Sequence, residues 1–300
     1  MKKLQVSFEG IVDKTGYLFS LVKCLSAALR CSEYKDFADD IIATSGFAFR
    51  MWAAADLCPS AMSIWEFKKQ KEWVENGGLI CDYEERLWGQ DAIEEERRLS
   101  AIRKIEYSID SGVAAVAWDV SGCEWGLIIG YDDDTQTFAT LKINGQEDIL
   151  PYEKLGRLEL PILSVLTVVG KQEKASEVLV TDTIKLSRAH LRGEEWCDNA
   201  KGLAAYDTIL SFITEKWSDN AAWQLEYYLG TYAALKWYAW KFFEKYNEIQ
   251  CAEQYKTIYE AWKEAFDIKC KKGTDERSRA EIAELLKKAN AMEEEYCNFS

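Results

Sequence analysis

Residues 113–145, VAAVAWDVSGCEWGLIIGYDDDTQTFATLKING, determine the fold expected for the first half of the chain. Short apolar runs bounded by turn residues predict buried strands over 113–120, 125–131 and 137–143. Asn144-Gly145 is a strong signal for a β-hairpin after the third of these strands. A last apolar strand is predicted over 158–169, so this part of the chain contains a strand meander.

Helical patterns lie on both sides of these strands. Upstream, helices are predicted over 18–29, 36–49, 63–76 and 91–108. Downstream of Gly170 almost every segment is helical, with spans near 176–192, 199–217, 219–248, 250–271 and 275–296. Helices followed by a run of strands are typical of an α+β fold. We expect an α+β domain over 1–172 and an α-helical domain over 173–300.

Composition excludes several classes of partner. The 300 residues include 51 Asp and Glu against 37 Lys and Arg, a formal net charge of −14, which disfavours nucleic acid and anionic membrane surfaces. No signal peptide or membrane-spanning run is readable. Nine cysteines without a CxxC pair predict free thiols in a reducing cytoplasm. With one histidine and scattered cysteines, no metal site and no cofactor are predicted.

Cys24 is the thiol with the clearest chemical potential. It lies in Lys23-Cys24-Leu25-Ser26-Ala27-Ala28-Leu29, near the start of a predicted helix whose small residues would allow close packing on a sheet. A cysteine at a helix N-terminus is favoured as thiolate by the helix dipole. The alternative is that the preceding apolar run places Cys24 inside the helix, as a small buried residue.

Three features in order resemble a known family. They are Ser45-Gly46-Phe47-Ala48-Phe49-Arg50 with Cys58-Pro59-Ser60, the segment WDVSGCEWGLIIGYDD over 118–133, and LPYEKLGR over 150–157. Together with the CxxAAL pattern at Cys24, they resemble papain-like cysteine peptidases, and more specifically a family related to the N-terminal domain of the butirosin-biosynthesis acyltransferase, protein H. The resemblance implies a papain-like domain joined to a helical domain, with thiol-mediated acyl transfer or peptide cleavage as the family's chemistry.

The sequence departs from that family at the catalytic positions. The resemblance places the catalytic histidine at Glu124 or Trp125, the residue that orients it near Leu141 or Lys142, and the oxyanion-hole glutamine near Leu18 or Phe19. None of these positions holds the expected residue type.

The chemistry of the substitutes is unfavourable for a thiol enzyme. Glu124 has an ordinary pKa near 4.3, and its negative charge would oppose thiolate formation at Cys24. The single histidine, His190, lies in the basic patch Ser187-Arg188-Ala189-His190-Leu191-Arg192, where we expect a solvated side chain at a helix end.

Other residues suit ligand binding. Arg50 among aromatic residues can clamp a carboxylate or phosphate, or can form a structural ion pair with Asp119 or Asp56. Asp119, at the end of a predicted strand, either satisfies a loop backbone or lines a cleft. Trp65, Trp125 and Tyr131 complete the candidate binding residues; the alternative for the tryptophans is helix-packing core.

Three functions follow from these observations. The first is a diverged, non-catalytic papain-like protein that binds a small molecule or peptide near Cys24, Arg50 and Asp119. The second is a thiol acyltransferase or amidase that uses Cys24 with Glu124 or His190 as base, for which an acyl-carrier-type donor is a suitable partner. The third is an interaction module whose helical half pairs with another protein or with a second copy in a homo-oligomer. The missing catalytic residues favour the first.

Overall fold

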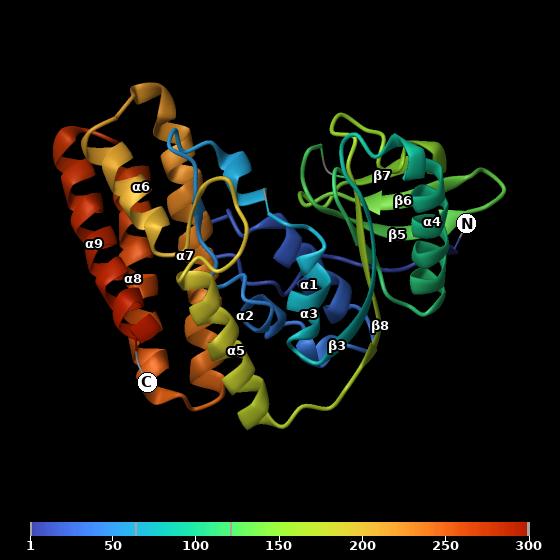
Figure 1. Ribbon diagram of the computed structural model, residues 1–300, viewed down its shortest axis with the longest axis horizontal. Coiled ribbons are helices and arrows are strands. Elements are labelled where there is room, and N and C mark those ends of the chain that lie inside the picture. The colour runs from blue at the N-terminus through green and yellow to red at the C-terminus, as the bar shows by residue number, and fades with distance from the viewer. Residues whose placement is uncertain (1, 64, 121, 299–300) are drawn as a thin grey trace. The chain divides into compact units, whose positions relative to one another are not determined.

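The computed structural model describes residues 2–63, 65–120 and 122–298 of the chain (Figure 1). The chain divides into two compact units. The first contains Met1–Val12, Phe19–Ile41 and Phe67–Ala175; the second contains Asp13–Leu18, Ile42–Glu66 and Ser176–Ser300. Segments 13–18 and 42–66, expected in the N-terminal domain, thus belong to the helical unit. Ile64 and Ser121, which fall within the predicted helix 63–76 and the segment 118–133, lie outside the described residues.

A seven-stranded antiparallel sheet forms the centre of the first unit as far as the structure describes it. Its strands are β1 (Lys2–Lys3), β3 (Leu79–Arg86), β4 (Ala115–Ala117), β5 (Gly126–Asp132), β6 (Thr137–Leu141), β7 (Glu147–Pro151) and β8 (Leu163–Lys171). The order is β3-β8-β4-β5-β6-β7, and β1 pairs with β5. The predicted meander is confirmed for β4 to β7, which follow one another as antiparallel neighbours. The last predicted strand, 158–169, corresponds to β8, which leaves the meander and lies between β3 and β4.

The hairpin predicted at Asn144-Gly145 is also confirmed. β6 and β7 pair with Leu141 opposite Glu147, and the turn closes through a 2.8 Å bond from Gly145 N to the Lys142 carbonyl oxygen. Gly145 has φ of +84°, a conformation that glycine adopts without a Cβ penalty.

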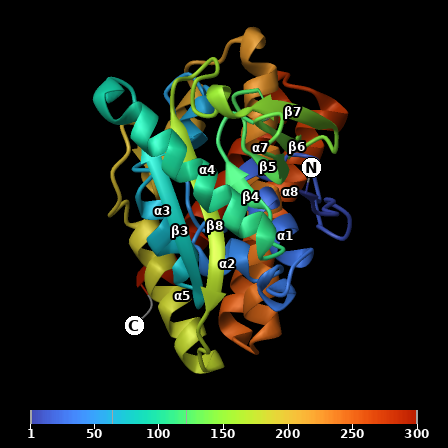
Figure 2. The same cartoon turned by 90° about the vertical axis from the view of Figure 1, so that its right-hand side faces the viewer.

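Helices cover the two faces of this sheet. The helices of the first unit are α1 (Ser20–Arg30), α3 (Lys69–Glu75) and α4 (Glu94–Asp110), with 3₁₀ turns at Lys35–Phe37, Asp91–Ile93 and Tyr152–Lys154. Figure 1 shows α4 on one side of the strands and α1 and α3 on the other, and in Figure 2 α4 crosses in front of β8 and β4. α1 packs against β4 and β5.

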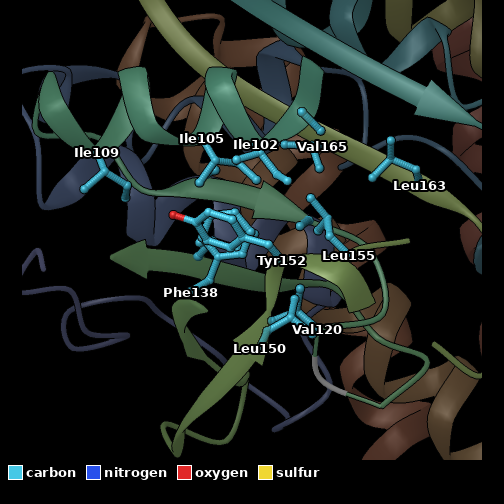
Figure 3. Packing of buried hydrophobic residues seen from close by; sticks show 14 residues of the cluster. Ile102, Ile105, Ile109, Val120, Phe138, Leu150, Tyr152, Leu155, Leu163 and Val165 are labelled. Atoms are coloured by element: carbon cyan, nitrogen blue, oxygen red, sulfur yellow. The ribbon is translucent and has the colours of Figure 1, made fainter. Parts of the chain in front are cut away.

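The hydrophobic core under α4 shows which side chains of the strands face this helix. Ile102, Ile105 and Ile109 of α4 point at the sheet, where the rings of Phe138 and Tyr152 lie 4.3 Å apart (Figure 3). Ile128 of β5 and Ala117 of β4 belong to the same core. Because successive side chains alternate along a strand, Leu127 of β5 lies on the opposite face, which α1 covers.

Strand β3 was missed by the sequence analysis. Its sequence, LICDYEER, carries too many charges to stand out as a buried strand. In the structure its charged residue Glu84 is buried and accepts hydrogen bonds from Arg97 and Lys104 of α4, at 2.7 and 2.6 Å. The buried face of this strand is thus satisfied by ion pairs, which an apolar pattern does not reveal.

The second unit is mainly helical. It contains α2 (Ile41–Thr44, whose first residue belongs to the first unit), α5 (Ser176–Leu191), α6 (Ala204–Thr214), α7 (Ala222–Lys245), α8 (Ile249–Lys272) and α9 (Glu276–Asn298), with 3₁₀ turns at Pro59–Ser63 and Asp219–Ala221. α8 packs against both α7 and α9 (Figure 1). A two-stranded sheet joins β2 (Trp52–Ala53) to β9 (Ala200–Lys201).

The helices predicted over 176–296 agree with the structure to within a few residues, except at the start of α6. There, residues 199–203 contain β9 and Gly202, whose φ is +58°. The helix predicted over 36–49 is wrong over most of its length, because only α2 is α-helical there and a turn follows it. Among the helices of the described residues, none combines the length and apolarity needed to cross a bilayer.

Candidate functional site

Cys24 lies inside α1 rather than at its start. The helix begins at Ser20, so Cys24 is one turn in, and its side chain is 0% exposed. Burial raises the pKa of the Cys24 thiol; the charge of Lys23 opposes this shift and that of Glu124 adds to it. In this position the sulfur is a protonated interior group, in line with the packing alternative.

The polar pair at this end of α1 is formed by Ser20 and Glu124. Ser20 is the first residue of the helix, and its hydroxyl donates a hydrogen bond to the carboxylate of Glu124, two residues before β5. Ser20 is buried and Glu124 half-buried. Burial raises the pKa of Glu124, while the bond from Ser20 opposes the rise. Glu124, predicted as a stand-in base, therefore meets a hydroxyl and not the thiol.

A constrained loop presents Glu124 to the helix. Asp119 and Cys123 both have left-handed backbones, with φ of +61° and +57°, which cost free energy for residues other than glycine. The Asp119 carboxylate offsets this by accepting bonds from Cys123 N at 2.7 Å and Leu160 N at 3.3 Å. Asp119 thus satisfies loop backbone, one of the two roles expected for it.

Aromatic rings lie next to this loop on the α1 face of the sheet. Trp125 directly follows Glu124, and its ring lies 5.3 Å from that of Trp118 and 5.7 Å from that of Phe67. Two-residue alternation places Trp125 on the same face as Leu127, the face that α1 covers. Trp125 is completely buried.

Tyr131 belongs to the other end of β5. Its hydroxyl donates to Asp110 at 2.8 Å, and this bond raises the pKa of Tyr131 to about 12. Tyr131 lies six positions after Trp125 along the strand, which corresponds to a distance of roughly 20 Å. The structure therefore does not bring Tyr131 to the Ser20–Glu124 pair.

Arg50 lies in the second unit, where its partner is Glu195. The Arg50 Nε lies 3.0 and 3.2 Å from the two carboxylate oxygens of Glu195, and its guanidinium carbon lies 4.3 Å from the Phe47 ring centre. The structural ion pair is present, but the partners expected for it, Asp119 and Asp56, were wrong. Burial lowers the pKa of Arg50 to about 10, still far above neutrality.

His190 is buried in the same cluster. Its Nδ1 lies 3.2 Å from Glu195, and its Nε2 contacts Nη2 of Arg50. Burial and the charge of Arg50 lower the pKa of His190 to about 4, so the ring is neutral at pH 7. The expected solvated histidine is therefore wrong: the end of α5 is covered, and both ring nitrogens have partners.

Trp65 also belongs to the second unit. Its ring stacks on that of Trp52 at 5.5 Å and 8°, and meets the ring of Phe47 edge-on at 5.7 Å. Phe47 and Trp52 are also the rings that flank Arg50. These contacts are packing within the unit, the alternative weighed for the tryptophans.

The other positions implied by the family resemblance hold no catalytic group. Leu18, Phe19 and Leu141 are buried apolar residues, and Lys142 pairs with Asp148 at 2.7 Å. Sequence reasoning missed Ser20 and Glu195. The preference for serine at helix starts was the available signal for Ser20. No signal in the sequence pointed to Glu195, which lies 145 residues from Arg50.

Comparison with known proteins gives no family assignment. No protein-family model matches the chain, and no curated protein matches it.

Proposed function

We propose that this protein is a diverged, non-catalytic papain-like protein, related to the N-terminal domain of butirosin-biosynthesis protein H, that binds a small molecule or peptide beside Ser20 and Glu124. The hydrogen bond between these two residues carries the proposal. It sits where α1 meets the start of β5, which is where the family resemblance places nucleophile and base. The antiparallel sheet with α1 packed on β4 and β5 is compatible with that fold.

Electrostatics supports binding over catalysis at this position. Acyl transfer needs a helix N-terminus or backbone N–H groups to stabilise a developing oxyanion. Here a carboxylate, Glu124, already lies at the N-terminus of α1, and its charge repels a second anion. Cys24, the remaining thiol on this helix, is buried and protonated.

Two measurements test the proposal. Iodoacetamide labelling followed by peptide mass analysis should leave Cys24 unmodified while the exposed Cys31 and Cys270 react. Native mass spectrometry of freshly purified protein should show a retained small molecule or peptide. Glu124→Gln should reduce that retained mass, and Glu96→Gln, on the exposed side of α4, should not. Fast, selective modification of Cys24 would contradict a non-catalytic role.

The same hydrogen bond favours a second candidate, a serine-dependent acyl-transfer enzyme. A hydroxyl within reach of a carboxylate whose pKa is raised is a nucleophile–base arrangement. Ser20 would attack an ester or thioester carbonyl while its proton passes to Glu124, giving an acyl-serine and releasing the alcohol or thiol.

Intact-protein mass spectrometry with p-nitrophenyl acetate decides between the two. The enzyme candidate requires a mass increase of one acetyl group that Ser20→Ala and Glu124→Gln abolish and Cys24→Ala preserves. The non-catalytic proposal expects p-nitrophenyl acetate to add the same mass to wild type and to Ser20→Ala.

A further inference from the structure

A cavity of about 360 Å³ lies in the first unit, where the N-terminal segment, α1 and the hairpin between β6 and β7 meet. The pairing of β1 with β5 holds the N-terminal segment in place, and Lys3 forms a salt bridge with Glu147 of β7. The volume lies at the lower end of the roughly 300–1,000 Å³ that small-molecule sites occupy. Ser20 and Glu124 are not among the described residues that line this cavity, so it is distinct from the site of the proposed function.

Hydrogen-bond donors line this cavity from three segments of the chain. Lys23 of α1 contributes an ammonium group, whose Nζ lies 5.5 Å from the ring centre of Phe8. Asn144 of the hairpin contributes its amide. The Oδ1 of Asn144 accepts a bond from Gln146 N at 2.9 Å, which leaves the NH₂ group as the end of the side chain that can bind a ligand. The exposed hydroxyl of Ser7 can donate as well.

The remaining lining residues supply apolar surface and one carboxylate. The carboxylate of Glu147 already pairs with Lys3, so its negative charge is balanced at the wall of the cavity. The side chains of Phe8 and Ile143 line the cavity and are only half-buried. A ligand therefore meets the positive charge of Lys23, further donors and apolar contact surface.

We propose that this cavity binds a small organic carboxylate that carries an apolar group. The two oxygens of a carboxylate only accept hydrogen bonds, which suits the ammonium of Lys23 and the NH₂ group of Asn144. The apolar group packs on Phe8 and Ile143. A neutral amide lacks the charge that strengthens the bond to Lys23, and an ammonium ion would place a like charge beside it. The inference goes beyond the proposed function and does not depend on it.

A matched pair of probes tests the chemical class of the ligand. Phenylacetate and phenylacetamide have the same ring and nearly the same size, but only phenylacetate is charged at neutral pH. Binding is measured by NMR titration of the protein labelled with ¹⁵N. Wild type should bind phenylacetate about tenfold more tightly than phenylacetamide, the effect of one charge-assisted hydrogen bond. The chemical-shift changes should centre on residues 6–8 and 141–147.

Two variants test the donors. Lys23→Met should abolish the preference for phenylacetate, whereas the control Lys35→Met, at an exposed position of the same unit, should retain it. Asn144→Asp keeps the oxygen that accepts from Gln146 N and suits the same type of turn, but replaces the NH₂ group with a second oxygen. Repulsion between carboxylates should weaken its binding of phenylacetate by about tenfold or more.

Three results would overturn the inference. They are equal binding of the two probes by wild type, equal affinities of Lys23→Met and Lys35→Met for phenylacetate, and absence of shift changes over 6–8 and 141–147. Urea unfolding establishes that each variant is folded, and Asn144→Asp keeps the test decisive if Lys23→Met does not fold. The proposed function is tested separately, by the retained mass and its dependence on Glu124.

Discussion

The residue His190 illustrates how partners fix a protonation state. Arg50 has only donors, so the Nε2 of His190 that contacts it must be the acceptor. The proton then resides on Nδ1, which donates to Glu195 at 3.2 Å. Protonation of Nε2 would bring a second cation against the guanidinium in a buried site, which is why the pKa of His190 falls.

This shift predicts acid sensitivity. Below pH 6.5 the unfolded chain takes up a proton at His190, whereas the native protein does not do so until about pH 4. The stabilisation from the neutral His190 is therefore complete above pH 6.5 and is lost as the pH falls. The loss of unfolding free energy amounts to roughly 3 kcal/mol by pH 4. Urea unfolding at several pH values should show this loss in wild type.

The variant His190→Gln isolates the contribution. Glutamine keeps one donor and one acceptor but does not titrate, so its unfolding free energy should fall less steeply between pH 6.5 and 4. Because His190 is the only histidine in the chain, no other imidazole contributes in this window. Parallel pH curves for the two proteins would contradict the shifted pKa.

The turn at Gly46 gives a second prediction at this scale. Gly46 has φ of +79°, and a Cβ there would lie 2.5 Å from His190 Nε2; Gly16 has φ of +82° with nothing within 4 Å. Gly16→Ala should cost about 1–2 kcal/mol from backbone strain alone. Gly46→Ala should cost about 1–3 kcal/mol more, because His190 must move. Equal losses of unfolding free energy for the two variants in chemical denaturation would show that His190 moves aside without cost.

The site residues show what local sequence can and cannot reveal. The position of Glu124 relative to α1 was expected from the order of motifs, and the helix around Cys24 from its apolar pattern. The helix begins two residues later than predicted, which places Ser20 in its first turn; Cys24 lies one turn in and is buried. The partners of Arg50 and His190 come from distant segments, and no periodicity of a single segment encodes them.

At the scale of elements, a helix or strand could be predicted from the sequence where its buried residues are apolar. α5, α7, α8 and α9 are amphipathic or apolar over many residues and were predicted to within a few positions. β3 was missed because its inward residue Glu84 is charged and is satisfied by α4. Charge pairs between elements stabilise the fold without leaving an apolar pattern in either segment.

The helical unit contains such a pair in its interior. Lys236 of α7 and Glu293 of α9 are both 0% exposed in their side chains and lie 2.7 Å apart. Tyr206 of α6 donates to the other oxygen of Glu293 at 2.9 Å and accepts from Trp262 of α8 at 2.9 Å. Burial lowers the pKa of Lys236, while Glu293 opposes the shift. Four helices thus share one polar network.

A double-mutant cycle should show that this pair specifies the packing more than it stabilises it. Lys236→Met leaves a buried carboxylate unpaired and should cost about 3–5 kcal/mol of unfolding free energy. Adding Glu293→Leu should recover most of that loss, because apolar residues of similar size replace both charges. Losses that simply add in urea unfolding would contradict coupling between α7 and α9.

At the scale of the whole chain, the helical unit is discontinuous in sequence. The segment 42–66 contributes Phe49, whose ring lies 5.2 Å from Tyr255, 5.8 Å from Phe243 and 6.4 Å from Tyr296. The same segment supplies β2, whose residue Trp52 exchanges two hydrogen bonds with the Tyr232 hydroxyl, at 2.9 and 2.6 Å. The core of this unit therefore depends on residues that precede most of the first unit.

This dependence predicts how fragments behave. A fragment of residues 173–300, cut at the boundary that the sequence suggested, lacks Phe49, Arg50 and β2. It leaves Glu195 without its guanidinium partner and exposes the rings of Tyr255, Phe243 and Tyr296. It should retain helical circular dichroism but unfold without a cooperative transition and bind the dye ANS, as loosely packed states do. A second fragment, in which a Gly/Ser linker joins residues 42–66 to 176–300, restores these contacts and should regain a sigmoidal urea transition. Cooperative unfolding of the fragment 173–300 by itself would show that its helices form a sufficient core without the inserted segment.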